Sequence, residues 1–338
     1  MSEAALRRRG SPAPGAPRLS AAQVLALVSE PMQAVEARLL AQMDSPVGRI
    51  PEVGGHLLGA GGKRLRPLLA VLACRATDAP LNVAIAVGCA AELIHTATLF
   101  HDDVVDGGAV RRGRPAARMV YGNGIAVLVG DFCLARGLET VSATGSLVAV
   151  ESLAAAVTEM AEGEVAQLEG AGDPETTADS YFDVIDRKTG SLMAWCARVG
   201  GVLPVPLDAA MARYGRLLGR AFQITDDVLD CAGDETESGK SPGRDLREGK
   251  LTLPVLLACQ ARPDLRDDIR SAMGESGVSM ADAARIVQTT RAAGGLDRAR
   301  AQAMALADDA VAELQAVPPS SFRDALASLA HLSVERVA

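Results

Sequence analysis

The segment from residue 81 to 106 constrains the fold more than any other part of the chain. Its apolar residues continue with helical periodicity into "HTATLFHDDVVD" at residues 95–106, and Gly107 and Gly108 end it. This pattern predicts a buried helix that ends in three aspartates. The C-terminal end of a helix carries partial negative charge, so three carboxylates placed there need a compensating cation.

The composition also favours helices over a sheet. Hydrophobic residues make up 49% of the 338 residues but aromatic residues only 3%, so Ala, Leu and Val must form most of the core. Close-packed helices suit such a core better than a sheet, which favours β-branched and aromatic residues. No run of alternating strands is visible, and only "IAVLV" at residues 125–129 is compatible with a short strand.

Helical periodicity continues through most of the chain after Ser20. This serine is expected to cap a first helix over residues 21–43, with a kink at Pro31. Breaks rich in Gly, Pro and Asp separate further helices, which are expected at residues 65–77, 81–106, 124–142, 146–170, 177–199, 207–231, 250–261, 280–293, 295–316 and 320–336. We therefore expect one all-α domain over residues 20–338, after a disordered tail at residues 1–19.

Charge and cysteine content limit the possible partners and the compartment. The net charge of −8 makes nucleic acid a poor partner, and it would repel a phosphorylated substrate unless basic residues or metals reverse the local field. Six scattered cysteines without a CxxC pair predict reduced, mostly buried thiols and a cytoplasmic protein. The N-terminal arginines have no apolar segment behind them, so no signal peptide is expected. The longest uncharged run, residues 79–91, is too short to span a bilayer.

One acidic pattern occurs twice, as "DDVVD" at residues 102–106 and "DDVLD" at residues 226–230. On a helix, the first and last aspartates of each pattern lie on one face, about 6 Å apart, and repel each other. Mg²⁺ suits such a pair, because it takes a few carboxylates and keeps positions for water and phosphate oxygens. A solvated helix end would explain one copy, but each copy here follows an apolar stretch. Two helices that face each other across a metal-lined cavity are therefore expected.

Basic segments are placed to complement these acidic ends. Arginine binds phosphate through two parallel hydrogen bonds, and lysine adds a point charge. Each segment alone could be a solvated turn, but in an acidic chain two of them directly follow the acidic motifs. The segments are "GAGGKRLRP" at 59–67, "VRRGRP" at 110–115, "DRKTG" at 186–190 and "GKSPGRDLREGKLTLP" at 239–254. This arrangement favours a site for two anionic groups, one held through metal and one held directly.

Two histidines flank the first motif. His95 precedes Asp102 by nearly two turns on about the same face, so it could donate a hydrogen bond to a phosphate. His101 is equally compatible with a packed polar residue, and neither His56 nor His331 has neighbours that suggest a zinc site.

Taken together, these motifs resemble the signature of the trans-isoprenyl diphosphate synthases, the polyprenyl synthetases. The resemblance covers two DDxxD motifs, "GGKRLRP", "RRGRP", the "KT" pair, "FQITDDVLD" and "GKSPGRDLREGKLTLP", and it runs from about Leu19 to the C-terminus. It implies the all-α isoprenoid synthase fold, a helical bundle around a central cavity, usually as a homodimer. It also implies Mg²⁺-dependent, head-to-tail condensation of isopentenyl diphosphate with an allylic diphosphate, with about three ions per site.

The resemblance also assigns roles to individual residues. Those implied in catalysis are Asp102, Asp103, Asp106, Asp226, Asp227, Asp230 and Lys188, of which Asp102, Asp106, Asp226 and Asp230 would bind metal. Isopentenyl diphosphate would be bound by Lys63, Arg66, His95 and Arg112. The allylic diphosphate would be bound by Arg111, Lys188, Thr189, Gln223, Lys240 and Lys250. Gly190 and Met193 replace the Ala and Phe that are frequent in the family, which bears on the shape of the cavity.

Small residues behind the first motif bear on product length. Ala97 and Thr98 stand where short-chain members carry bulky aromatics that stop chain growth, and Ile94 follows one turn further back. Close packing of a buried helix would also explain small residues here. Because "HTATLFHDDVVD" resembles the long-chain, octaprenyl-type branch, we expect a product longer than C20, in the C30–C45 range of quinone side chains. Transient membrane contact would then serve product release.

Four alternatives remain open at this point. A shorter geranylgeranyl or farnesyl product is one, and a catalytic subunit that needs a small partner is another. A terpene cyclase of the same fold would normally lack the second DDxxD and "GGKRLRP". A non-catalytic regulatory subunit would be expected to show degenerate aspartates, whereas all six are present here.

Overall fold

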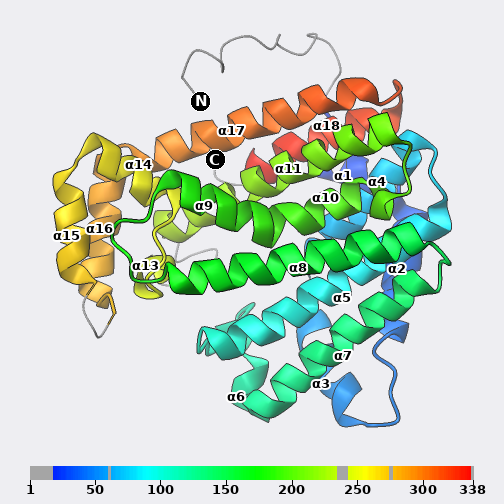
Figure 1. Ribbon diagram of the computed structural model, residues 1–338, viewed down its shortest axis with the longest axis horizontal. Coiled ribbons are helices and arrows are strands. Elements are labelled where there is room, and N and C mark those ends of the chain that lie inside the picture. The colour runs from blue at the N-terminus through cyan, green and yellow to red at the C-terminus, as the bar shows by residue number, and fades with distance from the viewer. Residues whose placement is uncertain (1–17, 60–61, 234–242, 274–276, 336–338) are drawn as a thin grey trace.

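The computed structural model describes residues 18–59, 62–233, 243–273 and 277–335 (Figure 1). Within these ranges the chain is almost entirely helical, so the predicted all-α class is confirmed. The sheet in this part of the chain is a single antiparallel pair, β1 (Val110–Arg111) and β2 (Arg114–Pro115). Arg112 and Gly113 join the two strands with φ of 52° and 73°, the left-handed conformation that a two-residue hairpin turn requires. Of the predicted tail, only Arg18 and Leu19 lie within the described residues.

The first predicted helix is in fact two helices, α1 (Ala21–Ala26) and α2 (Ser29–Ala41). Ser20 caps α1 as predicted, since its side chain accepts a backbone hydrogen bond from the first turn. The predicted kink at Pro31 is wrong, because the chain breaks at Val28, whose φ of −131° is not helical. Pro31 lies in the first turn of α2, where a backbone N–H has no acceptor within the helix.

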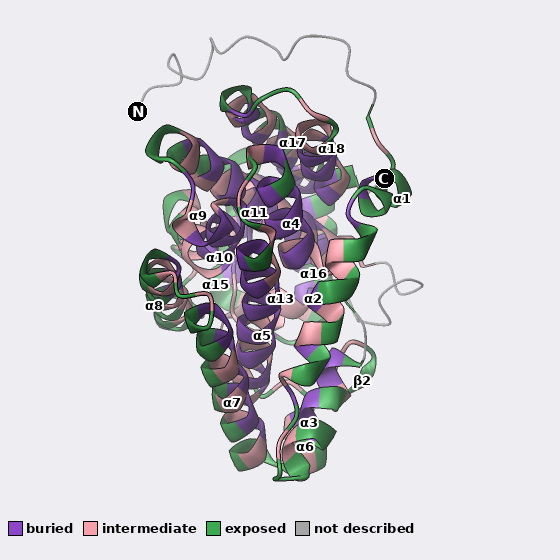
Figure 2. Ribbon diagram, turned by 90° about the vertical axis from the view of Figure 1, so that its right-hand side faces the viewer, coloured by how far each residue is buried: buried purple, intermediate pink, exposed green. Residues whose placement is uncertain are grey.

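Long helices form the body of the protein. They are α4 (Leu65–Thr77), α5 (Leu81–Val105), α7 (Asn123–Ser142), α8 (Leu147–Glu169), α11 (Val205–Ala232), α16 (Met280–Ala292), α17 (Gly295–Glu313) and α18 (Ser321–Val334). α5 packs against α4 and α7, and Figure 2 shows it as a buried helix in the middle of the molecule. α11 packs against α17 and carries the second acidic motif near its C-terminal end. The alternative of a strand at residues 125–129 is wrong, because this segment lies inside α7.

The segment after α8 is more divided than the sequence predicts. Instead of one helix over residues 177–199, the structure has α9 (Ala178–Ile185), the π-helical turn η2 (Asp186–Gly190) and α10 (Ser191–Ala197). The 3₁₀ turn η3 (Val199–Gly201) then leads to α11.

Several short helices were not predicted. They are α3 (Arg49–Leu58), α6 (Ala117–Tyr121), α13 (Arg244–Arg247) and α15 (Asp264–Ala272), and a 3₁₀ turn, η4 (Leu314–Ala316), follows α17. The helix predicted over residues 250–261 begins later, as α14 (Leu253–Ala261), because Thr252 is extended and Pro254 lies in the first turn. α3 forms although it contains a proline and two adjacent glycines, and it buries Val53, Leu57 and Leu58.

α5 is also long and apolar enough, by composition alone, to cross a membrane. Its most apolar window has a mean hydropathy of 1.7, but 78% of that window is buried inside the protein. Glu92 ends the uncharged run within this helix and is itself buried. The burial fits a core helix, whose apolar surface is covered by neighbouring helices.

All six cysteines are buried and free, as predicted. Burial raises the pKa of Cys74 to about 11 and the pKa values of Cys89, Cys133 and Cys196 to about 12. These thiols are therefore protonated at neutral pH and serve as small apolar packing groups.

Candidate active site

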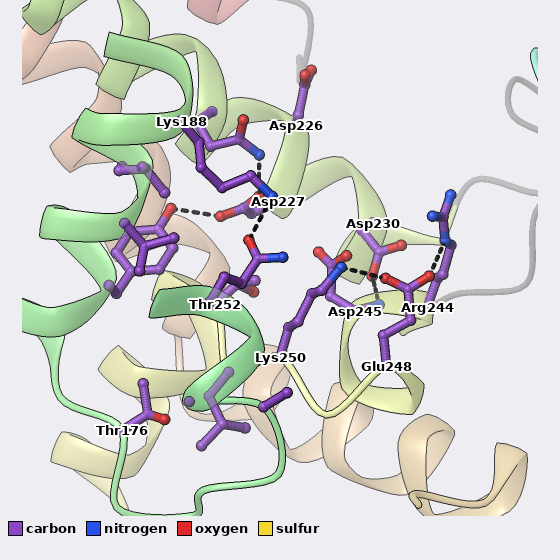
Figure 3. Close-up of a pocket in the computed structure, with 18 of the residues that line it drawn as sticks. Thr176, Lys188, Asp226, Asp227, Asp230, Arg244, Asp245, Glu248, Lys250 and Thr252 are labelled. Carbon is purple, nitrogen blue, oxygen red and sulfur yellow. Dashed lines mark hydrogen bonds and ion pairs between the residues drawn. The ribbon is translucent and has the colours of Figure 1, made fainter. Parts of the chain in front are cut away.

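Both acidic motifs open into one cavity of about 770 Å³ (Figure 3). The C-terminal end of α5 contributes Asp102 and Asp106, and α11 contributes Asp226, Asp227 and Asp230. α8, α9, η2 and the segment 244–252 supply the other walls. The volume lies within the usual range of ligand sites, about 300–1,000 Å³.

The carboxylates in this cavity are held in an unfavourable, desolvated state. Burial, with smaller contributions from Glu164 and Asp106, raises the pKa of Asp102 to about 6 against the opposing charge of Lys188. Burial likewise raises the pKa of Asp227 to about 7, against hydrogen bonds from Tyr181 and Gln223. The lining of the cavity also contains more carboxylates than lysines and arginines.

Asp103 has a different place from the other aspartates. It is buried on α5. Its Oδ1 accepts two hydrogen bonds from Arg111, one from Nε at 2.9 Å and one from Nη2 at 2.7 Å. Arg111 lines the cavity, whereas Asp103 does not. Asp103 thus orients Arg111 rather than facing the cavity itself.

A chain of hydrogen bonds connects η2 with the second motif. Thr189 Oγ1 donates to Gln223 Oε1 at 3.0 Å, and Gln223 Nε2 donates to Asp227 Oδ1 at 2.9 Å. The hydroxyl of Tyr181 on α9 donates to Asp227 Oδ2 at 2.5 Å. Asp227 is therefore fixed from two sides, and Asp226 and Asp230 are its neighbours in the cavity wall.

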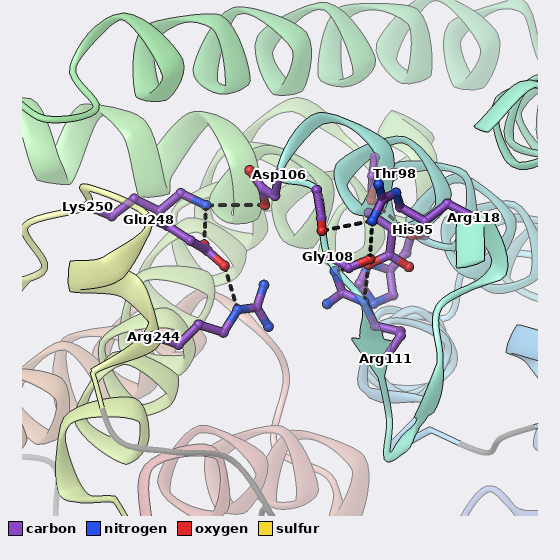
Figure 4. A network of polar contacts seen from close by, with 11 residues as sticks. His95, Thr98, Asp106, Gly108, Arg111, Arg118, Arg244, Glu248 and Lys250 are labelled. Atoms are coloured by element: carbon purple, nitrogen blue, oxygen red, sulfur yellow. Dashed lines mark hydrogen bonds and ion pairs between the residues drawn. The ribbon is translucent and has the colours of Figure 1, made fainter. Parts of the chain in front are cut away.

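Two lysines reach the cavity and are already paired with carboxylates. Lys188 Nζ forms an ion pair with Glu164 and lies 3.1 Å from Gln167 Oε1 on α8. Lys250 Nζ lies 2.8 Å from Glu248 and 3.3 Å from Asp106, as Figure 4 shows. Lys240, predicted for the same site, lies outside the described residues.

The cavity also contains residues to which sequence reasoning assigned no role. Asp245 and Glu248 belong to the recognised "GRDLREGK" segment but were not singled out, and the backbone N–H of Asp245 donates to Asp230 Oδ2 at 3.2 Å. Burial raises the pKa of Asp245 well above its usual value, and Asp230 and Asp227 add to this. No sequence signal marked Tyr181, because its role depends on a contact across 46 residues.

Two of the residues predicted to bind isopentenyl diphosphate, Arg66 and Arg112, lie near His95. Desolvation lowers the pKa of His95 well below its usual value, and Arg66 and Arg112 lower it further, so the imidazole is neutral. Arg112 donates to the carbonyl of Leu57 at 3.2 Å, at the C-terminal end of α3. Arg66 Nε is buried and has no hydrogen-bond partner among the described residues. Lys63, on the preceding loop, is exposed.

Arg64 fixes the loop that carries these cations. Its backbone is left-handed, with φ of 46°, and its side chain is only 14% exposed. Its Nε lies 2.5 Å from Glu36 Oε1 on α2, and its Nη1 lies 3.1 Å from Oε2 of the buried Glu92 on α5. These two carboxylates offset part of the positive charge of the arginine cluster.

None of the three residues predicted to set product length is among the residues that line the cavity. Ala97 and Ile94 are buried, and Ile94 packs against α7, where a Cβ added to Gly137 would lie 3.2 Å from Ile94 Cγ1. Thr98 is partly buried, and its hydroxyl donates to the carbonyl of His95 at 2.9 Å.

The donor set of the cavity fits Mg²⁺. Hard carboxylate oxygens line it, and their raised pKa values reflect a charge that a divalent cation would relieve. In the described part of the chain, no three His, Cys, Asp or Glu side chains converge tightly enough to hold a metal by themselves. Mg²⁺ commonly binds through one or two carboxylates and completes its shell with water and phosphate oxygens, so the pairs at each end of the cavity suit it.

Comparison with known proteins assigns the family. A model of the family described as polyprenyl synthetase matches residues 48–290. The chain belongs to this family. As a polyprenyl synthetase it has the isoprenoid synthase fold and is a prenyl-transferring enzyme, a polyprenyl diphosphate synthase.

Individual relatives of this polyprenyl synthetase match over nearly their whole lengths. The octaprenyl diphosphate synthase of Escherichia coli (strain K12) is 40% identical over 314 residues, 92% of this chain and 97% of its own. The nonaprenyl diphosphate synthase of Mycobacterium tuberculosis is 36% identical over 320 residues, which cover 92% and 95% of the two chains. A crystal structure of polyprenyl synthase from Caulobacter crescentus CB15, complexed with calcium and isoprenyl diphosphate, superposes with a TM-score of 0.90 at 39% identity and covers 96% of this chain and 100% of that one.

Proposed function

We propose that this polyprenyl synthetase condenses isopentenyl diphosphate with an allylic diphosphate, head to tail and in trans geometry. We propose a product longer than C20, in the C30–C45 range, with octaprenyl diphosphate as the representative. The main observation in support of this reaction is that one cavity is lined by aspartates of both acidic motifs together with Arg111, Lys188 and Lys250. The small Ala97 and Thr98 support the length, as do relatives named octaprenyl and nonaprenyl diphosphate synthases.

The allylic diphosphate would bind between the two acidic ends. Asp102 and Asp106 on α5, and Asp226 and Asp230 on α11, would hold Mg²⁺. Bound there, Mg²⁺ supplies Lewis-acid stabilisation of the negative charge on the leaving diphosphate. Arg111, Lys188 and Lys250 would bind diphosphate oxygens directly, together with Lys240 from the segment outside the described residues, and Thr189 and Gln223 would orient them.

The chain's own residues need supply no nucleophile for this chemistry. The allylic C–O bond breaks, and its electron pair leaves with the diphosphate. The double bond of isopentenyl diphosphate attacks the resulting allylic cation, and the released diphosphate takes the proton that is lost. Exclusion of water once both substrates fill the cavity would protect the cation from hydrolysis.

Isopentenyl diphosphate would bind at the arginine cluster around His95. Lys63, Arg66 and Arg112 would supply the positive charge, and the unpartnered Nε of Arg66 supports a ligand at this place. Because His95 is neutral, it would donate one N–H to the diphosphate without adding charge.

The decisive assay combines purified protein, Mg²⁺, labelled isopentenyl diphosphate and farnesyl diphosphate, followed by chromatography of the products. We expect polyprenyl products longer than C20, and loss of incorporation when EDTA removes the metal. Products of C20 or shorter would support the geranylgeranyl or farnesyl alternative. Absence of incorporation by the protein alone would contradict the proposal and favour a heteromeric or regulatory subunit.

We also propose that the protein is a homodimer that pairs through α7 and α8. These neighbouring helices leave large apolar side chains in solvent, among them Leu128 at 64%, Leu147 at 68% and Val165 at 55% exposure. Monomers rarely expose extended apolar patches of this kind. A second copy of this chain would cover them.

Sedimentation equilibrium of the wild-type protein and of Leu128→Glu tests this pairing. We expect a dimer for the wild type and a shift toward monomer for the variant, because a buried, unpaired carboxylate destabilises the interface. Met280→Glu is the matched control, since Met280 is 63% exposed at the start of α16, a helix that packs on α14 and α17. A monomeric wild type, or a Leu128→Glu dimer as stable as the control, would contradict the pairing.

We propose a cytoplasmic location for this dimer. Six free, buried cysteines support it. A water-insoluble product suggests transient membrane contact during release.

A further inference from the structure

The two site residues Lys188 and Thr189 lie on a π-helical turn. η2 (Asp186–Gly190) joins α9 to α10 and carries both residues into the cavity wall. Figure 3 shows Lys188 extending toward the aspartates of the second motif. A π turn contains one more residue than an α-helical turn, so it changes the direction of the side chains on it relative to the flanking helices. Something must hold this uncommon geometry.

On its far side, the turn is tied to two long helices by Asp186. Asp186 Oδ1 accepts a hydrogen bond from Arg220 Nε at 2.8 Å, and Oδ2 accepts one from an NH1 nitrogen of Arg216 at 2.7 Å. Arg216 also donates to Glu159 Oε2 on α8 at 2.7 Å. Asp186 does not line the cavity, and its side chain is only 17% exposed. The carboxylate thus joins η2, α11 and α8 from behind the site.

Glycines bring the backbone of the turn against both helices. A Cβ added to Gly219 on α11 would lie 2.9 Å from Gly190 Cα. On the other side, a Cβ added to Gly163 on α8 would lie 2.7 Å from Arg187 Cβ. The π turn therefore packs closely between α8 and α11, where Gly163 and Gly219 leave room for it.

Gly190 has a second role within the turn. A Cβ added to it would lie 2.9 Å from Asp186 Oδ1, the atom that Arg220 holds. The absence of a side chain at this position leaves room for the Asp186 carboxylate. Glycine at position 190, where alanine is frequent in the family, therefore leaves space for the ion pairs that Asp186 forms behind the turn.

We propose that Asp186 is a positioning residue for the allylic diphosphate. Together with Arg216 and Arg220 it holds η2 in the register that directs Lys188 and Thr189 into the cavity. This inference rests on the proposed role of these two residues in binding the allylic diphosphate. Ion pairs with partly exposed partners contribute little to stability, so the main consequence of losing Asp186 is misplacement of Lys188 and Thr189.

The test compares Asp186→Asn with Glu162→Gln. The first variant removes the charge behind the turn, and the second removes a surface ion pair to the same turn, Arg187–Glu162 at 2.7 Å. We expect Asp186→Asn to raise the KM for farnesyl diphosphate about tenfold, because loss of a supporting partner typically costs about 10–100-fold. The KM for isopentenyl diphosphate should change less than about twofold, and Glu162→Gln should behave as the wild type. Gly190→Ala, which crowds the carboxylate, should shift the KM for farnesyl diphosphate in the same direction.

Calorimetric titration with inorganic diphosphate and Mg²⁺ gives a readout that does not need turnover. Weaker binding by Asp186→Asn than by Glu162→Gln would support the positioning role even if the wild type transferred no prenyl group. Unchanged binding and KM in a folded Asp186→Asn variant would overturn it, as would an equal rise in the KM for both substrates. An inactive wild type would instead contradict the proposed function, so the two failures are distinguishable.

Discussion

Asp102→Asn is expected to lower kcat by at least about 100-fold while the protein remains folded. Asp102 lines the cavity, and burial raises its pKa to about 6. Because burial disfavours the charged carboxylate at this position, a neutral amide of the same shape should leave the Tm unchanged or higher. The amide would be a poor ligand for Mg²⁺, and the leaving diphosphate would lose the charge that stabilises it.

The variant is measured by steady-state kinetics across a Mg²⁺ titration, together with thermal unfolding. Asp226→Asn, from the opposite wall, should give a loss of similar size. Asp309→Asn is the matched control, because Asp309 is an exposed carboxylate on α17, outside the cavity. Retention of kcat within about tenfold of the wild type in both cavity variants would contradict metal binding by the paired motifs.

Thr98→Phe and Ala97→Phe are expected to shorten the product to geranylgeranyl length or less. With about 100° per residue, Thr98 lies about 40° from Asp102 around α5, whereas Ala97 lies about 140° away, on the side of α7. A phenyl group at Thr98 would therefore block a growing chain more directly. At Ala97 it would also overpack the contact between α5 and α7, which would lower the free energy of unfolding by about 1–3 kcal/mol.

Product chromatography with farnesyl diphosphate as primer checks this expectation. Ala301→Phe, at an exposed position of α17, controls for the added aromatic ring. An unchanged length distribution in both stable variants would show that the chain does not grow along this face of α5.

The helices that the sequence predicted well are those with long apolar periodicity. The local sequence was sufficient to predict α5 and α11, because each helix buries a continuous apolar surface and ends in a charged segment. η2 left no local signal, since its geometry comes from contacts of Asp186 and Gly190 with other helices. α3 was missed because tertiary packing of Val53 and Leu57 outweighs its breaker residues.

The site likewise contains residues that the local sequence reveals and residues that only the tertiary structure brings in. The aspartates and basic residues could be recognised because their spacing on one helix or in one loop is itself informative. The partners that hold them could not, because Glu164, Gln167 and Tyr181 reach the site from α8 and α9, far along the chain. Sequence reasoning thus found the groups proposed to contact substrate, whereas the structure was needed to find the groups that orient them.

The carboxylates that hold Lys188 and Lys250 would compete with an incoming diphosphate for the same ammonium groups. Glu164 and Glu248 are paired with these groups in the structure, so diphosphate binding at the proposed site would be an exchange of partners rather than a simple gain of contacts. The exchange would lower the affinity for substrate and for the released diphosphate alike. Re-formation of the two Glu–Lys ion pairs would assist the release of the diphosphate by-product. A synthase that adds many isoprene units to one chain needs this release before each further addition.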